Sequence, residues 1–141
     1  MSDLLLQASD EFGILVSVTA SSEFPPGRPE AQFDQFDEWC FHFDDGRFCV
    51  GVDRDFDTVV LTSAGSVYEH KVPVTDHDPF RSLVGCRLRW GWLLTNQRGY
   101  TDGVQLEFAR DRETWILQLV AEASSLRAYS LAGISHLSNL G

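Results

Sequence analysis

A segment of polar and aromatic side chains lies between two strand-like stretches in the second half of the chain. It offers indole, amide, phenol and carboxylate groups at Trp92, Asn96, Gln97, Tyr100, Asp102 and Gln105. Polar groups that converge beside an aromatic wall are typical of sites for small molecules or peptides. Gly99 and Gly103 permit positive φ angles that would bring the neighbouring side chains together. These six residues are a candidate binding site; in the alternative interpretation, Asn96 and Asp102 only bond backbone amides of a wide hairpin.

A second group of reactive side chains lies on a predicted hairpin. The dipeptide Asp45-Gly46 favours a two-residue turn, and this turn places Cys40, His42, Asp44 and Cys49 on one face. Cysteine beside histidine is the combination of a nucleophile with its base, and also of metal sites. In this register Cys49 lies opposite His42, and Cys40 reaches Cys49 only diagonally, which is poor geometry for a disulfide. We therefore expect packed cysteines rather than a reactive site.

Other motifs for chemistry are weak. His70, His77 and the two aspartates beside His77 resemble a metal cluster, but Asp78-Pro79 is also typical of a helix start. Three cysteines without a CxxC motif predict no zinc site and suit a reducing compartment. The sequence contains no glycine-rich phosphate loop, no GxSxG and no HExxH. An enzyme is therefore the least favoured class, and we expect neither a metal nor a cofactor.

The charge of the chain is strongly asymmetric. The first 80 residues contain 4 basic and 16 acidic residues, a net charge of −12, and the other 61 contain 7 and 5, a net charge of +2. Acidic surfaces disfavour nucleic acid, whose phosphates require Lys and Arg, and favour a basic protein; alternatively, the acidity only maintains solubility. Aromatic residues among the aspartates would anchor such a partner. The predicted partner surface comprises Asp34, Asp37, Glu38, Asp53, Asp55, Phe56 and Asp57.

The elements that position these groups are predicted to be mainly β. Alternation of apolar and polar residues predicts about nine strands in an antiparallel meander, which would form a sandwich or a curled, barrel-like sheet. One or two short helices are expected, near 3–8 and 76–84. The strands are expected near 14–20, 38–44, 47–53, 58–63, 66–72, 86–94, 104–108, 115–119 and 126–131. We expect the four tryptophans in the core, with Leu88, Trp90 and Trp92 on one buried face.

The length and composition predict a single domain over residues 1–141. Of these residues 43% are hydrophobic, which is enough to bury a core. Whether the polar tail 134–141 is ordered stays open, as does the oligomeric state. No run of eighteen apolar residues occurs, so we expect no membrane contact, and the N-terminus lacks the features of a secretory signal, so we expect the cytoplasm.

The run G-W-x-L-x-N-Q-x-G-Y-x-D-G-x-Q from Gly91 to Gln105 resembles the signature of a family of small uncharacterised bacterial proteins. The resemblance covers roughly Pro79 to Leu119 and implies a bacterial origin and a domain of this size, without an activity. Small acidic bacterial proteins of this kind are similar to immunity proteins encoded beside toxins. The sequence therefore predicts a non-enzymatic acidic binding protein, specifically an immunity-type inhibitor of a basic toxin. The alternative is a domain that binds a small molecule or peptide in a pocket at 92–105.

Overall fold

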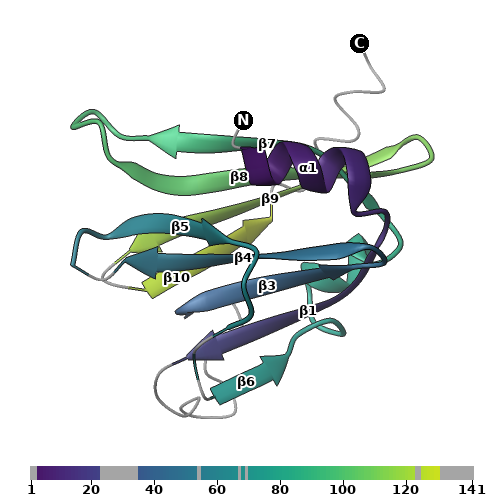
Figure 1. The fold of residues 1–141 in the computed structure, drawn as a ribbon, viewed down its shortest axis with the longest axis horizontal. Helices are drawn as coiled ribbons and strands as arrows, with labels where there is room; N and C mark the ends of the chain where they lie inside the picture. The colour runs from purple at the N-terminus through teal and green to yellow at the C-terminus, as the bar shows by residue number, and fades with distance from the viewer. Residues whose placement is uncertain are drawn as a thin grey trace.

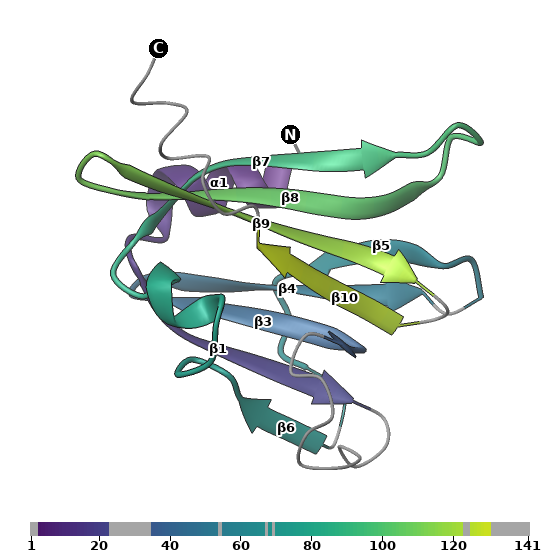
Figure 2. The same cartoon turned by 180° about the vertical axis from the view of Figure 1, so that it is seen from behind.

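The strands form two antiparallel sheets that pack face to face (Figures 1 and 2). The computed structural model describes residues 3–22, 35–53, 55–66, 68, 70–122 and 125–130. The first sheet contains β1 (Leu15–Ser22), β3 (Glu38–Phe43), β4 (Gly46–Asp53), β5 (Thr58–Thr62) and β6 (His70–Pro73), in the order β5-β4-β3-β1-β6. The second contains β2 (Gln35–Phe36), β7 (Arg87–Thr95), β8 (Thr101–Arg110), β9 (Glu113–Glu122) and β10 (Ser125–Ser130), in the order β2-β10-β9-β8-β7. The predicted mainly β fold is confirmed, and of the two predicted architectures it is the sandwich.

Two short helices complete the described part of the chain. Helix α1 (Asp3–Glu11) lies against β7 (Figure 1). The 3-10 helix η1 (Phe80–Leu83) comes directly before β7 in the chain and contributes Phe80 and Leu83 to the core. Both agree with the short helices expected near 3–8 and 76–84. No helix in the described ranges is long and apolar enough to cross a membrane. The tail 134–141 lies outside the described residues.

Aromatic rings join the two sheets. Phe41 of β3 stacks on Phe48 of β4 at 5.2 Å and meets Phe108 of β8 at 6.0 Å, measured between ring centroids. All three side chains are fully buried. They belong to one continuous apolar cluster that also takes in Leu5 of α1 and Phe80 of η1. The predicted alternation of β3 and β4, with the aromatic residues inward, is thus confirmed.

The predicted meander is wrong at one strand. The segment 66–72 was expected to pair with 58–63, but β6 pairs with β1 at the edge of the sheet opposite to β5. The connection between β5 and β6 therefore crosses the outer face of the sheet, in front of β4 and β3 in Figure 1. Ser63 and Ala64 mark this path, since their carbonyls lie against side chains of β4. A crossing of this kind covers part of the outer face.

The register of the β3–β4 hairpin differs from the prediction by two residues. The loop is Asp44-Asp45, and Phe43 pairs with Gly46, so that Cys40 lies directly opposite Cys49. Gly46 is needed for close packing rather than for the turn, because a Cβ there would lie 2.5–2.7 Å from ring atoms of Phe12. A shift by two residues keeps every side chain on its predicted face.

Substituting Gly46 with alanine is expected to lower the free energy of unfolding by about 1–3 kcal/mol, because the added methyl overlaps the rigid Phe12 ring. Gly51→Ala is the matched control in the same strand, since its Cβ would meet no atom closer than 3.7 Å. Urea unfolding followed by tryptophan fluorescence measures both variants. Equal stability of the two would contradict this account of the hairpin.

The expectation that Trp90 and Trp92 lie in the core is wrong. The register of β7 with β8 shifts between Leu88 and Trp90, so that Arg89 forms a bulge and the alternation reverses after it. Leu88 is buried, whereas Trp90 and Trp92 are 43% and 39% exposed. The inner position goes to Gly91, where even a Cβ would lie 2.8 Å from Leu5 of α1. An indole has no room there.

Candidate functional site

The polar side chains of the predicted 92–105 site mostly hold the β7–β8 hairpin together. Asn96 Oδ1 accepts hydrogen bonds from the backbone N–H groups of Arg98 at 2.9 Å and Tyr100 at 3.2 Å, and Asn96 Nδ2 donates to Asp102 at 3.4 Å. Gln105 accepts a hydrogen bond from Gln118 of β9 at 2.9 Å. This arrangement agrees with the alternative interpretation of a wide hairpin whose amide and carboxylate bond within the turn.

The structure separates the six residues into three positions. Trp92 and Gln105 are paired across β7 and β8 on the outer face, and Asn96 meets Asp102 at the base of the turn. Gln97 and Tyr100 are exposed at the tip, Tyr100 to 52%. The two hollows described below are lined by other residues, so these six side chains do not form a common wall around either of them.

The predicted acidic surface is only partly exposed. Asp55 and Phe56 are exposed in the turn between β4 and β5, Phe56 to 67%, and the Asp55 N–H bonds Asp53 Oδ1 at 3.0 Å. Asp53 and Asp57 flank this turn and are partly exposed. In both views, the turn lies at the same end of the molecule as the tip of the β7–β8 hairpin (Figures 1 and 2).

Two residues of the predicted surface are buried, which corrects that part of the prediction. Asp37 and Glu38 are only 8% and 6% exposed. The chain passes from one sheet to the other here, and the backbone of Asp37 is bonded to Ser21 and Val52. Asp37 therefore lies between β2 and β3, and Glu38 is covered at the start of β3, so neither side chain is open to a partner. Asp34 lies outside the described residues.

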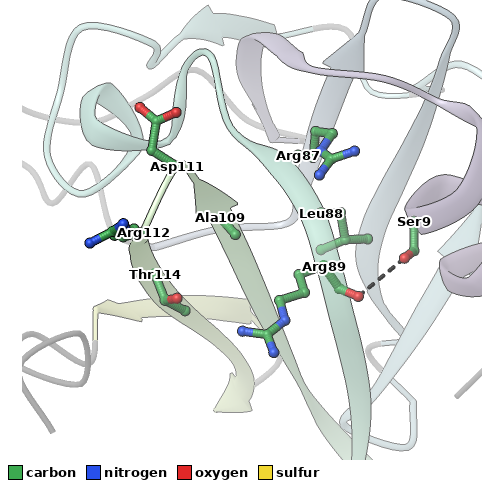
Figure 3. Close-up of a pocket in the computed structure, with 8 residues that line it drawn as sticks. All are labelled: Ser9, Arg87, Leu88, Arg89, Ala109, Asp111, Arg112 and Thr114. Carbon is green, nitrogen blue, oxygen red and sulfur yellow. Dashed lines mark hydrogen bonds between the residues drawn. The ribbon is translucent and has the colours of Figure 1, made fainter. Parts of the chain in front are cut away.

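The larger hollow lies beside edge strand β7, between α1 and the β8–β9 turn, and has a volume of about 520 Å³ (Figure 3). It is lined by Ser9, Arg87, Leu88, Arg89, Ala109, Asp111, Arg112 and Thr114. Figure 3 shows Arg87 and Arg112 pointing away from each other. Arg89 is paired with Glu107 of β8 instead, with 3.6 Å between Nε and Oε2. The arginines therefore share no common centre at which an anion would be held.

The smaller hollow lies on the outer face of the first sheet, beside the β5–β6 crossing, and has a volume of about 200 Å³. It is lined by Thr19, Cys40, His42, Arg47, Cys49, Gly65, Ser66 and Lys71. Cys40 and Cys49 form a disulfide in its wall, which corrects the expectation that these cysteines stay unpaired. The carboxylate of Glu38 and the two sulfur atoms all lie within 4.8 Å of one another. The sequence predicted that Cys40 and Cys49 share a face of the hairpin. It did not predict their disulfide, because the predicted register of β3 and β4 was wrong by two residues.

Among the residues that line this hollow, His42 has a pKa that its surroundings lower. Burial lowers the pKa of the imidazole below its usual 6.5, and the nearby charges of Arg47 and Lys71 lower it further. Its Nε2 lies 3.1 Å from the hydroxyl oxygen of Thr19. The ring is therefore neutral at pH 7 and able to form this hydrogen bond.

Acidification is expected to destabilise the protein through His42. Because the pKa of His42 is lower in the folded than in the unfolded chain, the unfolded chain binds more protons, and the free energy of unfolding falls as the pH drops below about 6.5. The loss ends below the pKa of the folded state. His42→Gln should flatten this part of the profile, measured by urea unfolding at a series of pH values. An unchanged slope in the variant would assign the pH dependence to other groups.

The comparison with known proteins gives one match. No curated protein and no solved structure is significantly similar to the chain. The model of a family of unknown function, DUF6334, matches residues 6–135, a range that includes the last two turns of α1, both sheets and both hollows. The chain therefore belongs to this family, DUF6334.

Proposed function

We propose that this protein is a non-enzymatic binding protein that captures a basic protein partner, specifically as an immunity-type inhibitor of a toxin in the cytoplasm. The observation that carries the proposal is the pair of exposed tryptophans on the outer face of the second sheet. Trp90 and Trp92 are 43% and 39% exposed, with ring centroids 6.2 Å apart. Exposed aromatic side chains that lie together are typical of protein interfaces.

The acidic turn between β4 and β5 supports a basic partner. Asp53, Asp55 and Asp57 surround Phe56, the most exposed large apolar residue described. Because this turn and the β7–β8 hairpin lie at one end of the molecule, a single partner that reaches both would meet carboxylates and aromatic rings together (Figure 2). The carboxylates would accelerate the encounter, and the rings would supply the buried contacts.

The cysteines give further support for a non-enzymatic role. Cys40 and Cys49 are bonded to each other. Cys86 is fully buried, and this burial raises the pKa of its thiol, which disfavours the reactive thiolate. In the disulfide-bonded structure, none of the three is thus in the state that nucleophilic catalysis requires.

The test is association with the products of the genes beside this one, measured by surface plasmon resonance. Reversing Asp53, Asp55 and Asp57 to lysine is expected to lower the association rate of the partner by about tenfold or more and to weaken its dependence on salt. The control reverses the same number of charges at the exposed residues Asp10, Asp44 and Asp45, where α1 ends and β3 turns into β4. Absence of any basic partner, or an equal effect of the control, would overturn the proposal.

A further inference from the structure

A buried carboxylate lies against the paired cysteines. Glu38, Cys40 and Cys49 are 6%, 3% and 0% exposed on the outer face of the first sheet. The Oε1 atom of Glu38 is 3.5 Å from Cys40 Sγ, and no ion pair holds this carboxylate among the residues that the structure describes. An ionised carboxylate that is removed from water without a cation is costly. A cation bound beside the Glu38 carboxylate would therefore offset this cost.

The surroundings of the sulfur atoms suit thiols as well as a disulfide. Cys40 Sγ faces the Glu38 carboxylate at 3.5 Å, and Cys49 Sγ faces the carbonyl oxygen of Ala64 at 3.5 Å. Both oxygen atoms accept hydrogen bonds, and only a reduced sulfur carries a proton to donate. The fold thus provides a polar neighbour for each sulfur in the reduced state.

An unpartnered hydroxyl lies next to these groups. Ser21 of β1 is paired with Glu38 of β3 across the sheet, so both side chains occupy the same outer face. Ser21 is 0% exposed, and its hydroxyl oxygen has no hydrogen-bond partner among the described residues. Buried polar groups normally have a partner, and a bound ion or water often supplies it when the protein does not.

We propose that the reduced Cys40–Cys49 pair and Glu38 form a binding site for a zinc ion. Two thiolates and a carboxylate are ligands that zinc prefers, and the three donor atoms already lie within 4.8 Å of one another. Because Cys40 and Cys49 also line the 200 Å³ hollow, water there would supply the fourth ligand that a tetrahedral zinc ion takes. The three anionic ligands exceed the charge of Zn²⁺ by one, and Arg47 and Lys71 in the wall of the hollow offset the excess.

Binding of zinc requires two steps, reduction of the disulfide and then exchange of the thiol protons for the metal. Two molecules of a thiol reductant convert the Cys40–Cys49 disulfide to two thiols and are themselves oxidised to one disulfide. Zn²⁺ then replaces the two thiol protons, which are released to water, and binds the carboxylate of Glu38. Oxidation of the pair removes two of the three ligands, so binding of the metal depends on the redox state.

Cobalt replaces zinc as the spectroscopic probe in the test of this site. The full-length protein, reduced with a phosphine and kept free of oxygen, should bind one equivalent of Co²⁺ with sulfur-to-cobalt charge-transfer absorption, and Zn²⁺ should displace it. The oxidised protein should show no such band. Glu38→Gln should weaken binding by roughly 100-fold or more, since loss of even an outer-shell partner of a metal ligand costs 10–100-fold. Cys86→Ser is the matched control and should bind like the unmodified protein.

A second measurement requires no variant of the site. Zinc should slow the alkylation of Cys40 and Cys49 in the reduced protein, followed over time by mass spectrometry, and leave the slow alkylation of the buried Cys86 unchanged. The proposal is overturned if reduced protein gives no charge-transfer band, if the band persists after Cys40→Ser and Cys49→Ser, or if zinc protects all three cysteines equally. It is also overturned if Glu38→Gln binds cobalt as tightly as the unmodified chain.

Discussion

Replacing Trp39 with alanine is expected to lower the free energy of unfolding by about 3–5 kcal/mol, the range for truncation of a large buried aromatic side chain. Trp39 is fully buried on β3 and contacts rings from two other elements. Its indole meets Phe36 of β2 edge-on at 5.6 Å and stacks on Phe80 of η1 at 6.3 Å. The substitution therefore opens a cavity at the junction of both sheets and the 3-10 helix. Urea unfolding measures the loss.

Two further variants separate the contributions of shape and polarity at this position. The Nε1 atom of Trp39 is buried without a hydrogen-bond partner among the described residues. Trp39→Phe removes this unpaired donor while it keeps an aromatic ring, so we expect a smaller loss than for alanine. Trp92→Ala is the control for loss of an indole at an exposed position and should cost about 1 kcal/mol or less. Equal losses for Trp39→Ala and Trp92→Ala would contradict the assignment of the core.

The alternation of side chains was sufficient to predict a mainly β fold, either a sandwich or a curled, barrel-like sheet, but not the register of its strands. In β3 and β4 the period of two places Phe41 and Phe48 inward, as predicted, because that choice depends only on which face is apolar. The position of the turn depends on Phe12, which is distant in sequence and packs on Gly46. A register that shifts by two residues leaves the pattern of faces intact, so the pattern could not reveal the shift.

Contacts between distant segments also explain the errors at the candidate sites. Trp90 and Trp92 were predicted to be buried because nothing in the residues around them indicates the bulge at Arg89. The bulge places Gly91 inward, where Leu5 of α1 packs against it. The alternation within β5 and β6 also gives no sign of the crossing between these two strands. It therefore could not predict that the crossing covers Cys49. The exposed acidic turn was predictable from residue types alone, since Asp55 and Phe56 follow a strand and precede another.

Loss of either exposed tryptophan is expected to weaken binding of the proposed partner by about 2 kcal/mol, or about 30-fold, while the fold stays intact. The reason is that Trp90 and Trp92 present large rigid rings on the outer face of β7, where a partner would bury them without any rearrangement of the core. Affinity is measured by surface plasmon resonance for Trp90→Ala and Trp92→Ala.

The effects of the two substitutions should not add. Because the rings contact each other with centroids 6.2 Å apart, the double variant should lose less than the sum of the single losses. Tyr129→Ala is the matched control, since Tyr129 is 36% exposed on β10, three strands away from β7 in the same sheet. A partner that binds through the outer face near β7 should tolerate this change. If instead Trp90→Ala and Trp92→Ala bind normally while Asn96→Ala or Tyr100→Ala abolishes binding, the contact lies at the tip of the hairpin, and the aromatic face is not the interface.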